Sequence, residues 1–303
     1  MVHRMKAFSL SLLSLFVLAA LSSAAEKLRV SSFSTILTEI AEQVGGDQVI
    51  VTGHVKPGVD PHEFEPKPGD LKKVGDAQII LLSAKHMEGY VGKLKESTGT
   101  KGAIIEVGDR FASLKMKPEP GHEGHGHAHE SDEDPHWWHS LACMKKAVKV
   151  VRDAFNKADP ASAAAFEANA AKYVAKLDEL QKWTRTELAK LPRDQRKLVT
   201  SHDAFQYFAK ENGFTVYAIE GLSTTDQPSS KKVAEIIAAI KTQGVKAIFP
   251  ESILNPKVLT EITRETGVKV GGELNADGLG DGDTATYEGM YKHYVSTIVS
   301  GLK

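Results

Sequence analysis

Apolar and polar positions in the first half of the chain alternate between short strand-like runs and longer helix-like runs. Gln78–Leu82 is almost wholly apolar, as expected of a strand that a parallel sheet buries on both faces. After Ser34 the apolar residues recur at helical spacing as far as Val44, and two glycines then end the helix. The segments between the strands are long enough for helices, so the pattern predicts βα units wound in one direction. The predicted strands are Leu28–Phe33, Val49–Val55, Gln78–Leu82 and Ala103–Val107.

A long helix-like segment separates this region from a second stretch of alternating strands and helices. Asp159 and Pro160 suit a helix start, and Pro192 stops the helix after Leu191. We therefore expect an α/β protein with lobes at residues 26–158 and 192–303, joined by a helix over 159–191. In the second lobe the predicted strands are Lys197–Thr200, Phe214–Ile219, Ala247–Pro250 and Val268–Val270, and the predicted helices are Asp203–Asn212, Ser229–Thr242, Pro256–Thr266 and a final one carrying Tyr287.

Residues 1–25 have the pattern of an export signal. Arg4 and Lys6 give a basic start, residues 7–21 carry no charge, and small residues follow as far as Ala25. The apolar run is shorter than the ~20 residues of a membrane-spanning helix. We expect cleavage after Ala25 and export to the periplasm, with an N-terminal membrane anchor as the alternative. No cysteine lies at this site, which excludes a lipid anchor there.

Composition narrows the possible functions. The chain has 303 residues with 38 Lys and Arg against 39 Asp and Glu, so its formal net charge of -1 argues against a nucleic-acid-binding protein. Cys143 is the only cysteine, so the chain forms no internal disulfide and no cysteine-based zinc finger. We expect Cys143 to be a buried apolar residue of an amphipathic helix. The twelve histidines are the unusual feature.

Four histidines fall in one segment of low complexity, residues 118–134. This segment is rich in Gly, Pro and acidic residues, shows no apolar periodicity, and is predicted to be a surface loop. Short histidine-rich tracts bind metal readily, so the loop is interpreted as a weak, exchanging zinc trap. The alternative is a solvated loop without a required role. Its histidines are His122, His125, His127 and His129.

Four other residues are candidate metal ligands. His62, His202 and Asp277 each follow a predicted strand, and ligands of open α/β sheets bind outside the carboxyl ends of strands. His136 directly follows the histidine-rich loop. Imidazole nitrogens with a carboxylate oxygen suit four-coordinate Zn²⁺, and a cleft between the lobes would bring these residues together. Taken singly, each could equally be a surface or hydrogen-bonding residue, because no local signature such as HExxH is present.

At these residues the sequence resembles the zinc- and manganese-binding solute-binding proteins of bacterial ABC importers. The resemblance covers the chain after the signal segment, and its most specific pieces are DPHEFEPKPGD (60–70), DPHWW (134–138), SHDAFQYFAKENG (201–213) and GGELNADGLG (271–280). It implies two Rossmann-like lobes joined by one rigid helix, with the metal in the cleft between them. By this resemblance His62, His136, His202 and Asp277 are the four ligands.

The resemblance also bears on the metal and on the function. A histidine at the third ligand position goes with zinc in this family, and a carboxylate goes with manganese, so His202 implies Zn²⁺ as the transported ion. The Irving–Williams order likewise favours Zn²⁺ over Mn²⁺ at a three-imidazole site. The implied function is a monomeric receptor that delivers Zn²⁺ to an ABC permease in the inner membrane and catalyses no reaction. The alternatives are a manganese receptor, an exported zinc hydrolase and a surface adhesin.

Further residues near the predicted cleft remain open. Glu63 and Glu251 could each orient a ligand imidazole, although we prefer a solvated carboxylate for Glu251. Where the family often has Gly-Leu-Glu, residues 85–88 read Lys-His-Met-Glu, so His86 is either an extra ligand or a polar residue lining the cleft. We expect Trp137 and Trp138 to pack near the cleft, and His139 to contact a ligand or to have no role.

Overall fold

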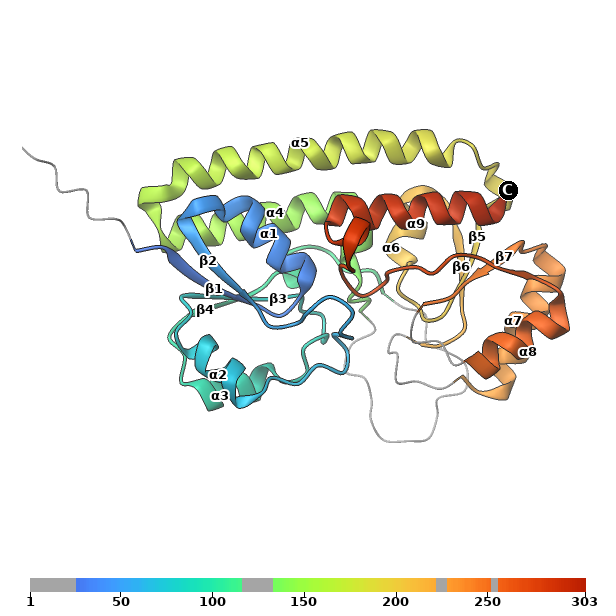
Figure 1. The fold of residues 1–303 in the computed structure, drawn as a ribbon, viewed down its shortest axis with the longest axis horizontal. Coiled ribbons are helices and arrows are strands. Elements are labelled where there is room, and N and C mark those ends of the chain that lie inside the picture. The colour runs from blue at the N-terminus through green and yellow to red at the C-terminus, as the bar shows by residue number, and fades with distance from the viewer. Residues whose placement is uncertain (1–25, 116–132, 222–227, 252–255) are drawn as a thin grey trace, which may run out of the picture.

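The computed structural model describes residues 26–115, 133–221, 228–251 and 256–303 (Figure 1). The predicted signal segment, residues 1–25, lies outside the described residues. So do residues 116–132, which include the four histidines of the histidine-rich loop.

Two four-stranded parallel sheets form the centres of two lobes (Figure 1). Their strand orders are β2-β1-β3-β4 and β6-β5-β7-β8, so the lobes repeat one topology. All eight predicted strands are confirmed, each with ends within two residues of the prediction. The strands are β1 (Leu28–Ser32), β2 (Val49–Gly53), β3 (Ile79–Leu82), β4 (Ala103–Glu106), β5 (Lys197–Thr200), β6 (Thr215–Ala218), β7 (Ala247–Phe249) and β8 (Lys269–Val270).

Helices cover both faces of the first sheet, which explains why β3 is apolar on both sides. Helices α1 (Thr35–Gly45) and α4 (Leu141–Ala158) lie on the face toward the long helix, and α2 (Pro68–Gly75) and α3 (Val91–Thr98) lie on the other (Figure 1). The predicted stripe of α1 is fully buried at Ile36, Leu37, Ile40 and Val44. Cys143 is buried in α4, as predicted.

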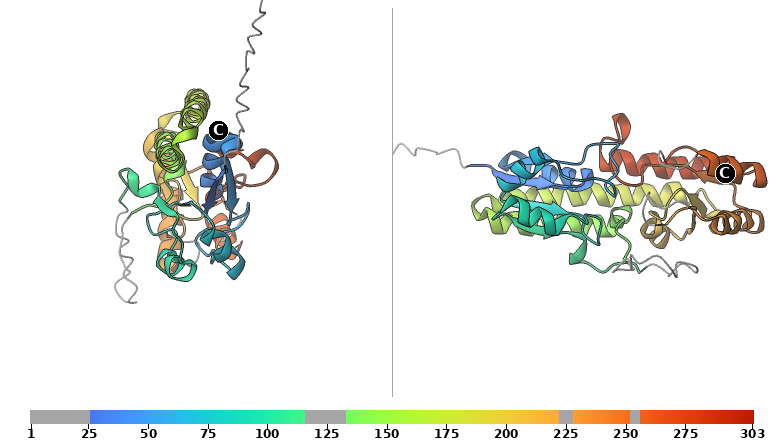
Figure 2. Two further views of the ribbon diagram at one scale, coloured as in Figure 1. Left: turned by 90° about the vertical axis from the view of Figure 1, so that its left-hand side faces the viewer. Right: turned by 90° about the horizontal axis from the view of Figure 1, so that it is seen from below.

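One long helix links the lobes, as the sequence predicts. Helix α5 (Ala163–Leu188) follows a 3-10 turn at Pro160–Ser162 and runs along the length of both lobes (Figures 1 and 2). It is shorter than the expected 159–191, because Asp159 has a non-helical backbone and the chain turns after Leu188. α5 packs against α1 and α4 in the first lobe and against α9 (Tyr287–Leu302) in the second. This attachment to both lobes favours small relative shifts over wide hinge closure.

The second lobe is built from the same parts. Helices α7 (Ser230–Gln243) and α8 (Pro256–Thr266) pack on each other at the outer end, and α9 lies beside α5 (Figure 1). Helix α6 (Gln206–Asn212) begins three residues later than predicted, because residues 202–203 form a bend after β5. A continuous apolar core joins the lobes and includes Trp138, Phe205 and Tyr287. No helix among the described residues is long and apolar enough to cross a membrane.

Candidate metal centre

The four candidate ligands come from four separate loops at the junction of the lobes. His62 lies in the loop between β2 and α2, and His136 immediately precedes the 3-10 turn Trp137–His139 that leads into α4. His202 follows β5, and Asp277 lies in the long loop between β8 and α9. Three of the four therefore follow the carboxyl ends of parallel strands, where α/β sheets place their ligands.

The structure brings one atom of each of these four side chains to a common point. His136 Nε2 lies 3.3 Å from His62 Nε2 and 3.3 Å from His202 Nε2. Asp277 Oδ1 lies 3.4 Å from His62 Nε2, 3.6 Å from His136 Nε2 and 3.3 Å from His202 Nε2. The four candidate ligand atoms all lie within 4.8 Å of one another.

These separations are those of a small tetrahedral cage. A regular tetrahedron whose corners lie ~2.0–2.1 Å from a central ion has edges of about 3.3–3.4 Å. Four of the six edges are 3.3–3.4 Å and the edge between His136 and Asp277 is 3.6 Å, while the edge between His62 and His202 is at most 4.8 Å. Five of the six edges therefore fit the size of a four-coordinate Zn²⁺ site.

Each of the two innermost imidazoles is oriented by a carboxylate on its other ring nitrogen. His136 Nδ1 lies 2.9 Å from Asp134 Oδ1, which also accepts the backbone N–H of His136. His202 Nδ1 lies 2.5 Å from Glu251 Oε2. Both imidazoles are fully buried. With the proton held on Nδ1, each Nε2 lone pair points into the cage, as in histidines that bind metal.

Our preference for a solvated Glu251 was wrong. Glu251 is buried and contacts a candidate ligand, because its own backbone N–H is held by Ser201 Oγ at 2.8 Å beside His202. Asp134 was missed altogether, although its place two residues before His136 was a visible signal. Glu63 lies on the surface, so its predicted orienting role is not supported.

The cage favours positive charge. Burial lowers the pKa of His202, but the charges of Glu251 and Asp277 outweigh burial, and the pKa of His202 is raised well above its usual value. Burial likewise opposes protonation of His136, yet Asp134 and Asp277 raise its pKa overall. Burial raises the pKa of Asp277, but the three imidazoles lower it well below its usual range. A carboxylate at this point is thus ionised and needs a cation.

Asp277 Oδ1 is buried, and its contacts with the three imidazole Nε2 atoms are 3.3–3.6 Å long, which is too long for strong hydrogen bonds. A buried carboxylate oxygen without a close hydrogen-bond donor is costly. A divalent cation at the centre removes this cost. The donor set therefore fits a metal ion on the chemistry of its own atoms.

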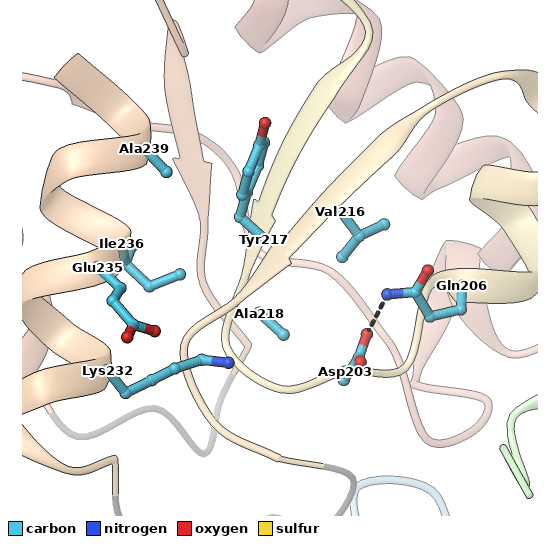
Figure 3. A pocket seen from close by; sticks show the side chains of 9 residues that line it. All are labelled: Asp203, Gln206, Val216, Tyr217, Ala218, Lys232, Glu235, Ile236 and Ala239. Atoms are coloured by element: carbon cyan, nitrogen blue, oxygen red, sulfur yellow. Dashed lines mark hydrogen bonds between the residues drawn. The ribbon is translucent and has the colours of Figure 1, made fainter. Parts of the chain in front are cut away.

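Two other polar residues do not contribute to the cage. His86 is exposed and belongs to a turn in which Ala84, Lys85 and His86 all have positive φ, so the structure does not bring it into the cage. Asp203, next to His202, accepts a 2.8 Å hydrogen bond from Gln206 Nε2 and lines a separate cavity of about 300 Å³ against α7 (Figure 3).

The aromatic residues behind His136 behave as predicted. Trp137 and Trp138 are fully buried and pack edge to face at a centroid distance of 5.8 Å. The Nε1–H of Trp137 donates to the carbonyl of Ser83 at 3.1 Å. His139 is also buried, and its Nε2 lies 2.8 Å from the carbonyl oxygen of Ala276, next to Asp277. His139 therefore contacts the backbone that carries a candidate ligand.

Two parallel-sheet lobes on a linking helix, with histidines and a carboxylate gathered between them, define the class of metal-binding receptors of ABC importers. The family model described as zinc-uptake complex component A, periplasmic, matches residues 30–301. The chain belongs to this family of metal-binding substrate-binding proteins.

Individual relatives carry the names of different metals. The manganese-binding lipoprotein MntA of Bacillus subtilis is 36% identical over 288 residues, which is 93% of this chain and 92% of MntA. The zinc-binding protein TroA of Treponema pallidum is 30% identical over 275 residues, covering 88% of this chain and 86% of TroA. A solved structure of the periplasmic zinc-binding TroA superposes with a TM-score of 0.79 at 29% identity, over 91% of this chain and 99% of that one.

Proposed function

We propose that this protein is an exported zinc receptor that binds one Zn²⁺ between its lobes and delivers it to an ABC permease. The ligand atoms are Nε2 of His62, His136 and His202 and Oδ1 of Asp277. The observation that carries the proposal is the set of five edges of 3.3–3.6 Å between these four atoms. Residues 1–25 would direct the chain to the periplasm.

The choice of zinc follows from the ligand types and the size of the cage. Three imidazoles and one carboxylate oxygen in a tetrahedron suit Zn²⁺, whereas Mn²⁺ prefers more ligands and more oxygen. Manganese is the second candidate, because a relative of 36% identity over almost its whole length is named manganese-binding. His202 favours zinc over manganese, because it gives the site a third imidazole where a manganese site would prefer an oxygen ligand.

A receptor fits the cage better than a hydrolase. Four protein ligands close a tetrahedral site, whereas a catalytic zinc keeps one position open for water. Glu251, the nearby carboxylate that could activate such a water, is already held against His202 Nδ1 at 2.5 Å. The ion is therefore cargo, held and then released.

The histidine-rich loop is proposed as a weak zinc trap that supplies this site. Its described ends are joined by an antiparallel bridge between Lys115 and Glu133 and by a 3.0 Å hydrogen bond from Asp134 N to Leu114 O. The described residues on either side of the loop therefore lie next to each other, and Asp134 is two residues before His136. Deleting residues 118–132 should leave tight binding intact and slow zinc uptake from dilute solution, measured by stopped-flow mixing.

The proposal is tested on the purified protein without residues 1–25. Elemental analysis should find one zinc per chain, and competition titration should give a lower Kd for Zn²⁺ than for Mn²⁺. His202→Glu should reduce this preference by adding an oxygen ligand, and Glu63→Gln, on the surface, serves as the matched control. A stoichiometric manganese complex whose Kd does not respond to His202→Glu would assign the protein to manganese instead.

A further inference from the structure

Asp277 lacks the kind of support that two of the histidine ligands have. Asp134 and Glu251 orient His136 and His202 from outside the cage, whereas the ligand oxygen of Asp277 contacts only the three imidazoles of the cage itself among the described residues. Asp277 also lies outside any helix or strand, in the loop that joins β8 to α9. Something other than regular secondary structure must fix this carboxylate.

Two side chains next to His136 hold the peptide immediately before Asp277. The carbonyl oxygen of Ala276 accepts a 2.8 Å hydrogen bond from Trp138 Nε1 and another of 2.8 Å from His139 Nε2. All of these groups are buried, with Trp138 1% exposed and His139 0% exposed. Two N–H donors on one carbonyl fix both its position and its direction.

The other side of Asp277 is held from the first lobe as well. Thr35, the first residue of α1, accepts the backbone N–H of Leu279 on its Oγ1 at 2.9 Å. Gly278 lies so close to this hydroxyl that a Cβ there would stand 2.5 Å from Thr35 Oγ1. Asp277 is therefore anchored on both sides to the first lobe, although its sequence position puts it in the second.

The anchor is itself fixed by a chain of hydrogen bonds between helices. Tyr287 at the start of α9 donates its hydroxyl to the carbonyl oxygen of Trp138 at 2.6 Å. The backbone N–H of Tyr287 donates to Glu39 Oε2 at 2.6 Å, and Tyr173 of α5 donates to Glu39 Oε1 at 2.9 Å. The backbone of Trp138 is thus tied to α1, α5 and α9, and burial of the indole keeps its N–H beside Ala276.

A histidine at position 139 would destabilise the fold relative to an apolar residue if it served only for packing. Because it donates from Nε2 to Ala276, its Nδ1 is an acceptor, and no described residue gives that buried atom a hydrogen bond. Its ring stacks on Phe205 at 4.4 Å, a contact that an apolar ring would make without this penalty. The hydrogen bond from His139 Nε2 to the Ala276 carbonyl offers a reason to keep a histidine there in spite of its unpaired Nδ1.

We propose that Trp138, His139 and Thr35 are positioning residues that hold the Asp277 carboxylate at the corner of the metal cage. This inference rests on the proposed four-ligand site. The segment 134–139 supplies the ligand His136 and the carboxylate of Asp134 that orients it. The same segment supplies two N–H donors that hold the Ala276 carbonyl and, through it, the second ligand Asp277. The three side chains act on the metal only through Asp277.

A double-mutant cycle on the purified protein tests this proposal. Trp138→Phe combined with His139→Phe removes both donors and keeps both rings, and we expect zinc Kd to rise about 10- to 100-fold, as when the outer contacts of a metal ligand are lost. In the Asp277→Ala background the same pair should add no further loss. His139→Gln, which keeps an N–H donor, should recover part of the affinity of His139→Phe, and Thr35→Ser should bind more tightly than Thr35→Val.

The possible outcomes test the positioning role separately from the proposed four-ligand zinc site. If Asp277→Ala binds zinc normally, the four-ligand site itself is wrong. If Asp277→Ala weakens binding while the Phe pair does not, only the positioning role is overturned, and an equal loss in both backgrounds assigns the pair a general structural role instead. Cobalt absorption bands supply a second readout, because both Asp277→Ala and the Phe pair should shift them in the same direction. Should the Phe pair not fold, Thr35→Val in the same cycle decides the question.

Discussion

His136 and His202 differ from His62 in how the protein supports them. The first two imidazoles are fully buried, and each has a carboxylate on Nδ1 at 2.9 Å or 2.5 Å. The His62 side chain is 9% exposed, and no described residue offers its Nδ1 a carboxylate. Its backbone N–H is held by Asp60 Oδ1 at 2.8 Å, so the loop positions the His62 backbone and not the imidazole ring.

This difference indicates an order among the proposed ligands. His136 and His202 are held in place before a metal arrives, because their orientation is set by protein contacts alone. The His62 ring has no such carboxylate on Nδ1, so we expect it to gain more of its orientation from the metal. A cage with two fixed corners and one adaptable imidazole allows entry and exit of an ion that a fully rigid cage would resist.

Loss of a supported imidazole should have the largest effect. His202→Ala removes a ligand and leaves Glu251 buried without its partner, so we expect zinc Kd to rise about a thousandfold, which corresponds to ~4 kcal/mol. His136→Ala should cost a similar amount. Competition titration with a chelator measures both. Equal affinity of His202→Ala and the parent protein would end the proposed ligand set.

Acid should weaken binding next most strongly, through the same two residues. The raised pKa values of His136 and His202 mean that the metal-free cage holds protons near neutral pH, and zinc must displace them. Each displaced proton lowers affinity tenfold per unit of falling pH, so we expect about 10- to 100-fold per unit. Zinc titrations from pH 8 to pH 5.5 should show this slope. A flat profile would show that the supported imidazoles are neutral before zinc binds.

Removing the supporting charge while keeping the imidazole should cost less. Glu251→Gln and Asp134→Asn each leave a hydrogen-bonding group of the same shape, and we expect zinc Kd to rise about 10- to 100-fold. Glu251→Gln should have the larger effect, because its contact with His202 Nδ1 is the shorter of the two. Glu63→Gln, an exposed carboxylate next to His62, is the control and should change nothing.

Asp134 and Glu251 also show which contacts of the site can be predicted from the sequence and which cannot. Asp134 acts across two residues on its own loop, so the local motif already contained it. Glu251 is 49 residues from His202, and only the pairing of β5 with β7 brings them together. Apolar periodicity predicted every strand because burial dictates it locally. The contact of His139 with Ala276, 137 residues away, had no local signal at all.

His62→Ala should have the smallest effect of the ligand substitutions. The side chain is partly exposed, so water can enter and replace the missing nitrogen, and the freed loop recovers the conformational entropy that zinc binding removes. We expect zinc Kd to rise about tenfold, with faster zinc dissociation rather than slower association, because the two supported imidazoles still capture the ion. Stopped-flow transfer of zinc to a chelator measures the dissociation rate directly. If His62→Ala loses as much affinity as His202→Ala, the carboxylate supports do not rank the ligands, and the cage is equally rigid at all three imidazoles.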